Sequence, residues 1–191
     1  HSIRRRQRQM CIRDSWWDTA NEKIFLYIAG EWKETIGIAA ATFYGDRGII
    51  SAGLNASYAA QSAIDYIDIT TASNGTDFGD LSSGNSGKLG CLSNAIRAVF
   101  GGGNNRTSTM DYITIATTGN AVDFGDLNAA GVLLAGVSHV TRGVWGGRDP
   151  RNNELQYITI ATTGNALDFG DLSVARYSAV SYTHLTLPTT D

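Results

Sequence analysis

A tandem repeat of about 45 residues occupies most of the chain and constrains its fold more than any other feature. The segment YITIATTGNAVDFGDL at residues 112–127 returns at residues 157–172 with 15 of 16 positions identical. A more divergent copy at residues 66–81 matches the middle copy at 10 of 16 positions. The copies begin 46 and then 45 residues apart. This regular spacing predicts that one supersecondary unit occurs three times within residues 47–178.

A second landmark accompanies the first in every copy. The sequences RGIISAG, RAVFGGG and RGVWGGR begin at Arg47, Arg97 and Arg142, and each precedes one of the repeated tyrosines. Two landmarks that recur in the same order in three copies exclude a chance similarity. We therefore expect each copy to fold in the same way.

The pattern within a unit predicts short β-strands. Residues 111–116 alternate, which puts Ile113 and Ile115 on one face and Tyr112 and Thr114 on the other. Residues 117–121 predict a turn, because glycine and asparagine accept the backbone angles that turns require. In the middle unit the four strands are expected at residues 97–100, 111–116, 122–127 and 132–137. With 22 glycines and only two prolines, the composition also suits short strands joined by tight turns.

These residues resemble a kelch repeat. A strand ends in a glycine pair, a variable loop follows, and the next strands carry a tyrosine and then an aromatic residue. The resemblance implies an all-β fold, namely a partial β-propeller of about three kelch-like blades with four short antiparallel strands each. It gives structural roles to Gly101, Gly102, Gly146, Gly147, Tyr66, Tyr112, Tyr157, Phe78, Phe124, Phe169, Asp80, Asp126 and Asp171.

The chain departs from the kelch pattern at several positions. Phenylalanine stands where kelch repeats usually carry tryptophan, and the first copy has Ser51, Ala52 and Gly53 in place of a glycine pair. Arg176 fits the arginine of the pattern, whereas Asn85 and Gly131 occupy the corresponding places in the other copies.

The phrase YITIATTGNAxDFGDL also resembles repeats in predicted structural proteins of marine bacteriophages. This resemblance implies a non-catalytic module of a virion or tail-associated structural or attachment protein, located in the virion. Its partner would be a protein or a glycan, bound through loops between strands. A cellular kelch-type scaffold for protein partners is the alternative, and a fragment of a propeller enzyme is the third hypothesis.

Both termini resemble translated sequencing adapters. We therefore exclude them from the prediction of fold and function, as targeting or cloning segments are excluded. Residues 1–15 include RRRQRQMCIRDS, and residues 179–191 read AVSYTHLTLPTTD. This interpretation predicts that the natural chain continues in both directions. Residues 16–46 form an N-terminal flank that is compatible with the tail of an eroded earlier blade, and residues 47–178 carry the kelch-like repeats.

Charge and hydropathy exclude two classes of partner. The whole chain has 15 basic and 18 acidic residues, and removing the termini leaves 10 basic and 16 acidic residues, a net charge of −6. Nucleic acid is therefore not expected as a partner, because phosphate binding requires clustered lysines and arginines. The longest apolar run, residues 24–29, is far too short for a membrane span.

No catalytic, cofactor or metal site is expected. Repeated aspartate pairs such as Asp123 and Asp126 could offer oxygen ligands to calcium, but aspartates beside glycine more often bond backbone amides in turns. His139 stands alone and is interpreted as a turn residue. Cys91, aligned with Val137, is interpreted as a small buried side chain. No acid and base pair, copper-type cluster or activated nucleophile is recognisable, so the chain is not expected to be an enzyme.

The segments between the glycine pair and the repeated tyrosine vary most among the copies. They read LNASYAAQSAID, GNNRTSTMD and RDPRNNELQ, whereas the flanking strands barely change. Sequence variation on a fixed scaffold predicts that these segments form the binding surface.

Overall fold

The computed structural model describes residues 15–18, 23–28, 31–34, 46–82, 89–104 and 106–182. Within these residues the chain contains only β-strands, turns and loops and no helix, which confirms the all-β expectation. The chain divides into two compact units, residues 1–43 and residues 44–191.

The first unit contains one antiparallel sheet in the order β1-β2-β3. Its strands are β1 (Ser15–Asp18), β2 (Lys23–Ile28) and β3 (Glu31–Glu34). The segment before Arg47 was expected to be the tail of an earlier blade. Most of it, residues 35–45, lies outside the described residues.

The second unit contains three antiparallel sheets, one for each copy of the repeat. Sheet I consists of β4 (Arg47–Ser51), β5 (Ala63–Asp68) and β6 (Thr76–Asp80). Sheet II consists of β7 (Gly90–Ser93), β8 (Arg97–Gly101), β9 (Thr109–Thr114) and β10 (Val122–Asp126). Sheet III consists of β11 (Ala135–Ser138), β12 (Arg142–Gly146), β13 (Asn152–Thr159) and β14 (Leu167–Arg176).

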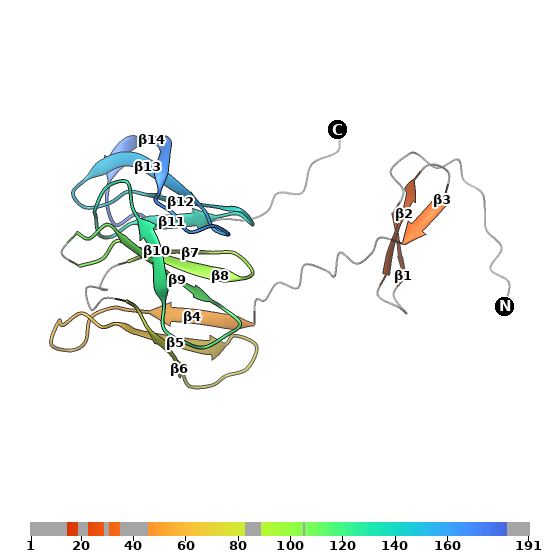
Figure 1. Ribbon diagram of the computed structural model, residues 1–191, viewed down its shortest axis with the longest axis horizontal. Helices are drawn as coiled ribbons and strands as arrows, with labels where there is room; N and C mark the ends of the chain where they lie inside the picture. The colour runs from red at the N-terminus through yellow and green to blue at the C-terminus, as the bar shows by residue number, and fades with distance from the viewer. Residues whose placement is uncertain are drawn as a thin grey trace. The chain divides into compact units, whose positions relative to one another are not determined.

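In each sheet, strands that are consecutive in sequence are also neighbours in space. Sheet II has the order β7-β8-β9-β10 and sheet III the order β11-β12-β13-β14, so both are simple antiparallel meanders. Figure 1 shows the three sheets stacked face to face, with sheet II between sheet I and sheet III. Each sheet therefore buries its apolar faces mainly against the next sheet along the chain.

The grouping of strands into sheets differs from the expected grouping. The sequence pattern placed the strand around residues 132–137 at the end of the middle unit. In the structure this strand, β11, pairs with β12 of the next copy, and Val137 lies opposite Val144. The reason is the connection length. The turn between β11 and β12 spans only residues 139–141, whereas residues 127–134 separate β10 from β11.

A bulge interrupts the pairing of the last two strands in every copy. It falls at the phenylalanine-glycine step of the repeated DFGD segment, for example between Asp123 and Gly125 on β10. The equivalent glycines Gly79, Gly125 and Gly170 have φ angles of 144°, 136° and 129°. Glycine adopts these positive angles without the steric cost that other residues incur.

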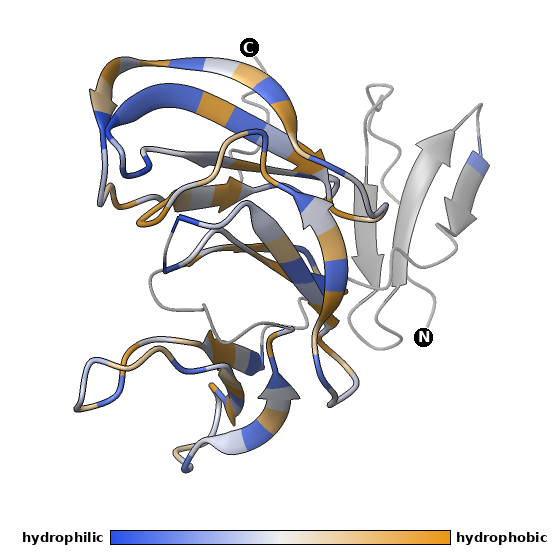
Figure 2. Ribbon diagram, turned by 60° about the vertical axis from the view of Figure 1, so that its left-hand side comes forward, coloured by the Kyte–Doolittle hydropathy of each residue, from blue (hydrophilic) through white to orange (hydrophobic). Residues whose placement is uncertain are grey.

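The core consists of two apolar layers, one in each space between neighbouring sheets. Ile64 and Phe78 of sheet I pack with Phe100 and Ile113 of sheet II. The second layer contains buried residues of sheets II and III, namely Leu92, Val99, Met110, Phe124, Leu127, Leu134, Trp145, Ile158, Ile160 and Ala166. Sheet II thus buries both faces, and Figure 2 shows apolar and polar residues alternating along the strands.

Candidate binding surface and the joints that position it

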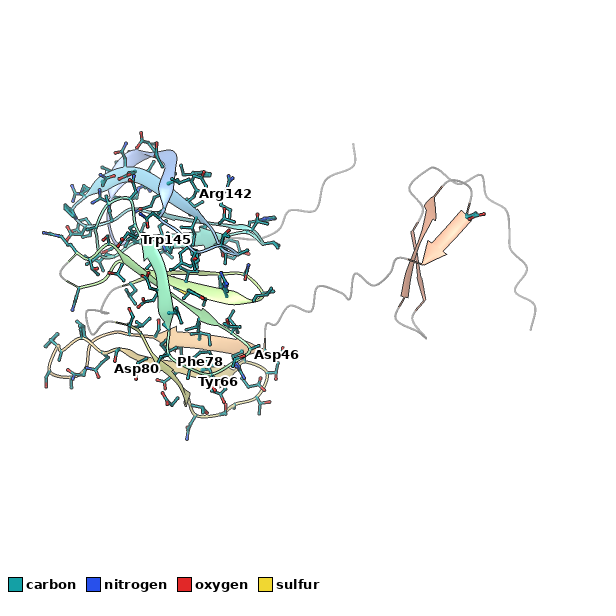
Figure 3. The ribbon with its side chains drawn as sticks, in the orientation of Figure 1. Asp46, Tyr66, Phe78, Asp80, Arg142 and Trp145 are labelled. Atoms are coloured by element: carbon teal, nitrogen blue, oxygen red, sulfur yellow. The ribbon has the colours of Figure 1, made fainter. Side chains whose placement is uncertain are left out.

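An arginine, a tyrosine and a phenylalanine stack in the same way in every sheet. In sheet II the Arg97 guanidinium lies 4.5 Å from the ring centre of Tyr112, and Tyr112 meets Phe124 edge to face at 5.8 Å. The other two sheets repeat this arrangement with Arg47, Tyr66 and Phe78, and with Arg142, Tyr157 and Phe169. Figure 3 labels Tyr66, Phe78 and Arg142 of these sets. The structure thereby brings the two sequence landmarks of each copy together.

The same arginine also bridges to the next sheet. Arg47 donates to the carbonyl of Ile115 in sheet II, at 2.6 Å. Arg97 donates to the carbonyls of Ile160 and Ala161 in sheet III, at 3.2 and 2.8 Å. From the sequence these arginines were recognisable only as landmarks of the repeat, without a role. Their fixed position before each tyrosine is the signal that could have suggested one.

The TTGN turns of the second and third copies each dock on the last strand of the preceding sheet. We call the contact between two neighbouring sheets a joint. In the first joint, between sheets I and II, Gly119 and Ala121 donate their amides to the carbonyls of Phe78 and Asp80, at 2.7 and 2.8 Å. The Asn120 side chain accepts a hydrogen bond of 3.0 Å from the Asp80 amide.

The second joint repeats these three bonds. Gly164 and Ala166 donate to the carbonyls of Phe124 and Asp126, and Asn165 accepts from the Asp126 amide. The near-identity of the repeated phrase therefore follows from its role at the joints, because both partners of every bond belong to that phrase.

The glycines of the repeat permit close contacts at the joints. A Cβ atom on Gly125 would lie 2.6 Å from the Gly164 carbonyl oxygen, and one on Gly101 would lie 3.2 Å from the Trp145 ring. Trp145 is fully buried, as expected for a core residue between two sheets. Gly102 and Gly147, the second members of the glycine pairs, have φ angles of 78° and 70°. Gly146 faces Leu155 on the neighbouring strand.

The repeated aspartates form hydrogen bonds within the scaffold. Ser62 donates its hydroxyl to Asp80, and Ser108 donates to Asp126, both at 2.9 Å. No such bond is recorded for Asp171 within the described residues. The described part of the chain contains no group of three or more His, Cys, Asp or Glu residues that could hold a metal ion.

The variable segments lie together at one edge of the three sheets, where β4, β8 and β12 end. We call residues 52–62, 102–104, 106–108 and 147–151 the loop surface. In the first loop, Asn55 accepts hydrogen bonds from the amides of Ser57 and Ala59. This closed turn holds Tyr58 at its tip, where the residue is 84% exposed.

The second and third loops contact each other. Arg106 and Asp149 form an ion pair at 3.0 Å. Arg148 donates to the carbonyl of Ala130 and to Glu154, which ties the third loop to the connection between β10 and β11. The second and third loops are thus joined into one charged surface, whereas the bonds of the first loop are internal to it.

Only the first part of each variable segment belongs to this surface. In the second copy the segment ends in β9, where Met110 is fully buried and the buried Asp111 accepts two hydrogen bonds from Ser82. In the third copy Gln156 is buried and accepts a hydrogen bond from the amide of Asn128. These core positions were not distinguishable from the loop in the sequence, because both vary among the copies.

Two further residues were assigned positions from the sequence. His139 is exposed in the turn between β11 and β12, as expected, and its amide bonds the Arg142 carbonyl. The expectation of a small buried side chain at Cys91 holds only in part: the residue as a whole is exposed, yet the atoms around its thiol desolvate it and raise the pKa of Cys91 to about 11. Gly90 and Leu92 are the buried positions of β7, and Leu92 belongs to the second core layer.

One carboxylate near the opposite edge of sheet I is stabilised in its charged form. Asp68 accepts hydrogen bonds from the hydroxyl and the amide of Thr70, at 2.6 and 2.8 Å. These two bonds lower the pKa of Asp68 below its usual value. The carboxylate therefore stays charged to a lower pH than an ordinary aspartate would, and its two bonds order the turn after β5.

Comparisons with known proteins add no family assignment. The chain matches no protein-family model and no curated protein sequence. Among the residues that the structure describes, no helix has the length and apolar character needed to cross a membrane.

Proposed function

We propose that the three sheets are consecutive blades of a kelch-like β-propeller and that the chain is a non-catalytic binding module. Three features support the propeller: one meander per copy, stacking of the sheets face to face, and the same bonds at both joints. The module would present its loop surface to a protein or a glycan.

The observation that carries this proposal is the contrast between the joints and the loops. Both joints use the same hydrogen bonds from the same residue types, whereas the three loops differ in sequence and in their internal bonding. A scaffold that keeps its joints and varies its loops can change its ligand without changing its fold. Tyr58 and Arg106 offer an exposed aromatic ring and an exposed cation, which are common anchors for protein and glycan partners.

The biological setting that we propose is a bacteriophage virion, in a structural or attachment protein. This part rests on the resemblance of the repeated phrase to repeats of marine phage proteins. Mass spectrometry of purified virions that encode the chain tests it directly. Peptides of the chain in intact particles are the expected result, and their absence from particles with full sequence coverage of the other structural proteins would reject it.

Binding by the loop surface is tested with glycan arrays and bacterial surface extracts. We expect the full chain to bind at least one component, and Tyr58→Ala or Arg106→Ala to weaken that binding at least tenfold. Ile96→Ala is the matched control, because Ile96 is also exposed but lies in the turn between β7 and β8, outside the loop surface. Equal loss in the control and the loop variants would place binding elsewhere. Selective binding to cellular proteins, with no virion peptides, would favour the scaffold alternative.

A further inference from the structure

Each joint has a forward side, contributed by one sheet, and a rear side, contributed by the next. The forward side of sheet II presents the Arg97 guanidinium, the Phe124 ring, and the carbonyls of Phe124 and Asp126. The rear side of sheet III presents a complementary set, namely the Ile160 carbonyl, the TTGN turn with Asn165, and the Trp145 ring. Sheets I and II meet in the same manner.

The forward side of sheet III has no rear side against it among the described residues. Phe169 is 47% exposed, whereas its equivalents Phe78 and Phe124 are each 2% exposed. Arg142 stacks on Tyr157 as in the other sheets but is exposed, and no described carbonyl accepts its inter-sheet bond. The face is thus built as a joint and retains the groups that a joint uses.

The rear side of sheet I is exposed in the corresponding way. Ile69 is 63% exposed, whereas its equivalent Ile160 is fully buried. Ile50 is 59% exposed and takes the place of Phe100 and Trp145, both of which are buried in the joints. Asn74 stands where Asn120 and Asn165 accept amide bonds in the two joints.

We propose that these two exposed faces bind each other between two copies of this chain, head to tail. The forward side of sheet III in one copy would receive the rear side of sheet I from the next, with Arg142 donating to the Ile69 carbonyl. The argument for this partner is complementarity: the chain forms the same joint twice internally, and it exposes one unused half of that joint at each end. The inference does not depend on which ligand the loop surface binds.

The intermolecular joint should be weaker than the internal joints. Association through it should continue beyond dimers. Ser73 replaces Gly119 in the first turn and keeps the amide donor, but Gly119 and Gly164 dock with φ angles of 155° and 154°, which a serine adopts at a steric cost. Because the two faces differ, the contact is heterologous, and each added copy leaves one face of either kind free. The expected behaviour is reversible association into dimers and larger species with rising concentration.

Sedimentation velocity of the full chain over a concentration series tests this inference. Phe169→Glu blocks the forward face, Ile69→Glu blocks the rear face, and both replace exposed side chains, so folding should be retained. Val122→Glu is the matched control, since Val122 is 55% exposed on sheet II and belongs to neither terminal face. Circular dichroism of each variant verifies that the fold is unchanged.

The mixture of the two blocked variants separates this contact from a symmetric one. We expect each blocked variant to be monomeric alone, and the equimolar mixture to form heterodimers but no larger species. The control should associate as the unmodified chain does. A monomeric unmodified chain at all concentrations would overturn the proposal and indicate that other segments of the same chain cover the faces. Unchanged association of the blocked variants, or a mixture that stays monomeric, would also overturn it.

Discussion

The Arg97 guanidinium donates to the Ala161 carbonyl at 2.8 Å while it lies over the Tyr112 ring of its own sheet at 4.5 Å. One side chain therefore joins the aromatic stack of sheet II to the backbone of sheet III. Arg142 keeps the stack but lacks the described carbonyl partner. The repeat thus provides its own internal control, because equivalent residues occur with and without a neighbouring sheet.

We expect Arg97→Ala to lower the free energy of unfolding by about 2–3 kcal/mol, and Arg142→Ala by less than about 1 kcal/mol. A hydrogen bond from a charged donor contributes about 1.5–3 kcal/mol and an exposed cation–π contact about 0.5–1 kcal/mol. Only the Arg97→Ala variant loses both the inter-sheet hydrogen bond and the cation–π contact. Chemical denaturation of the two variants provides the comparison. Equal losses would mean that the inter-sheet bond adds nothing to stability.

Phe124→Ala should destabilise the chain by about 3–5 kcal/mol, the usual cost of removing a buried phenylalanine ring. Phe169→Ala should cost about 1 kcal/mol, because that ring is nearly half exposed and loses only partly exposed contacts with Tyr157 and Arg142. Thermal and urea unfolding of both variants at low protein concentration measures the difference. A similar loss at the two positions would contradict the unequal burial of the two rings.

Gly125→Ala should be more destabilising than Gly170→Ala by about 1–3 kcal/mol. Both glycines have positive φ angles, 136° and 129°, so both substitutions introduce backbone strain. The added methyl group meets the Gly164 carbonyl in the first case and open space in the second. Parallel denaturation curves decide the order, and a larger loss for Gly170→Ala would refute the joint geometry.

Shortening the chain at its C-terminal end should have a small and position-dependent effect. Ser181 donates its hydroxyl to the Gly136 carbonyl at 2.6 Å, so truncation after residue 178 removes this exposed hydrogen bond. We expect truncation after residue 178 to lower the free energy of unfolding by about 0.5–1.5 kcal/mol, and truncation after residue 182, which keeps the Ser181 bond, to lower it less. Melting temperatures of the two shortened chains distinguish these cases. A drop of many degrees after either truncation would show that the removed residues carry essential packing.

The sequence by itself determined the repeat length, the all-β class and the alternation of apolar residues. These properties follow from local spacing: Ile113 and Tyr112 must point to opposite faces of a strand wherever that strand lies. The sequence also distinguished the constant segments of the repeat from the variable ones. The propeller closure, the ligand and the role of the adapter-like termini were inferred from resemblance, and they stay predictions.

Only the tertiary structure decided where one sheet ends and the next begins. A repeat of fixed length has no intrinsic boundary, so β11 could have been assigned to either sheet until its pairing with β12 was known. The bridge from Arg97 to Ala161 and the contact of Gly125 with Gly164 join residues far apart in the sequence. The exposure of Phe169 beside the burial of Phe124 was likewise beyond reach of the sequence. Identical local patterns differ there only in whether another sheet covers them.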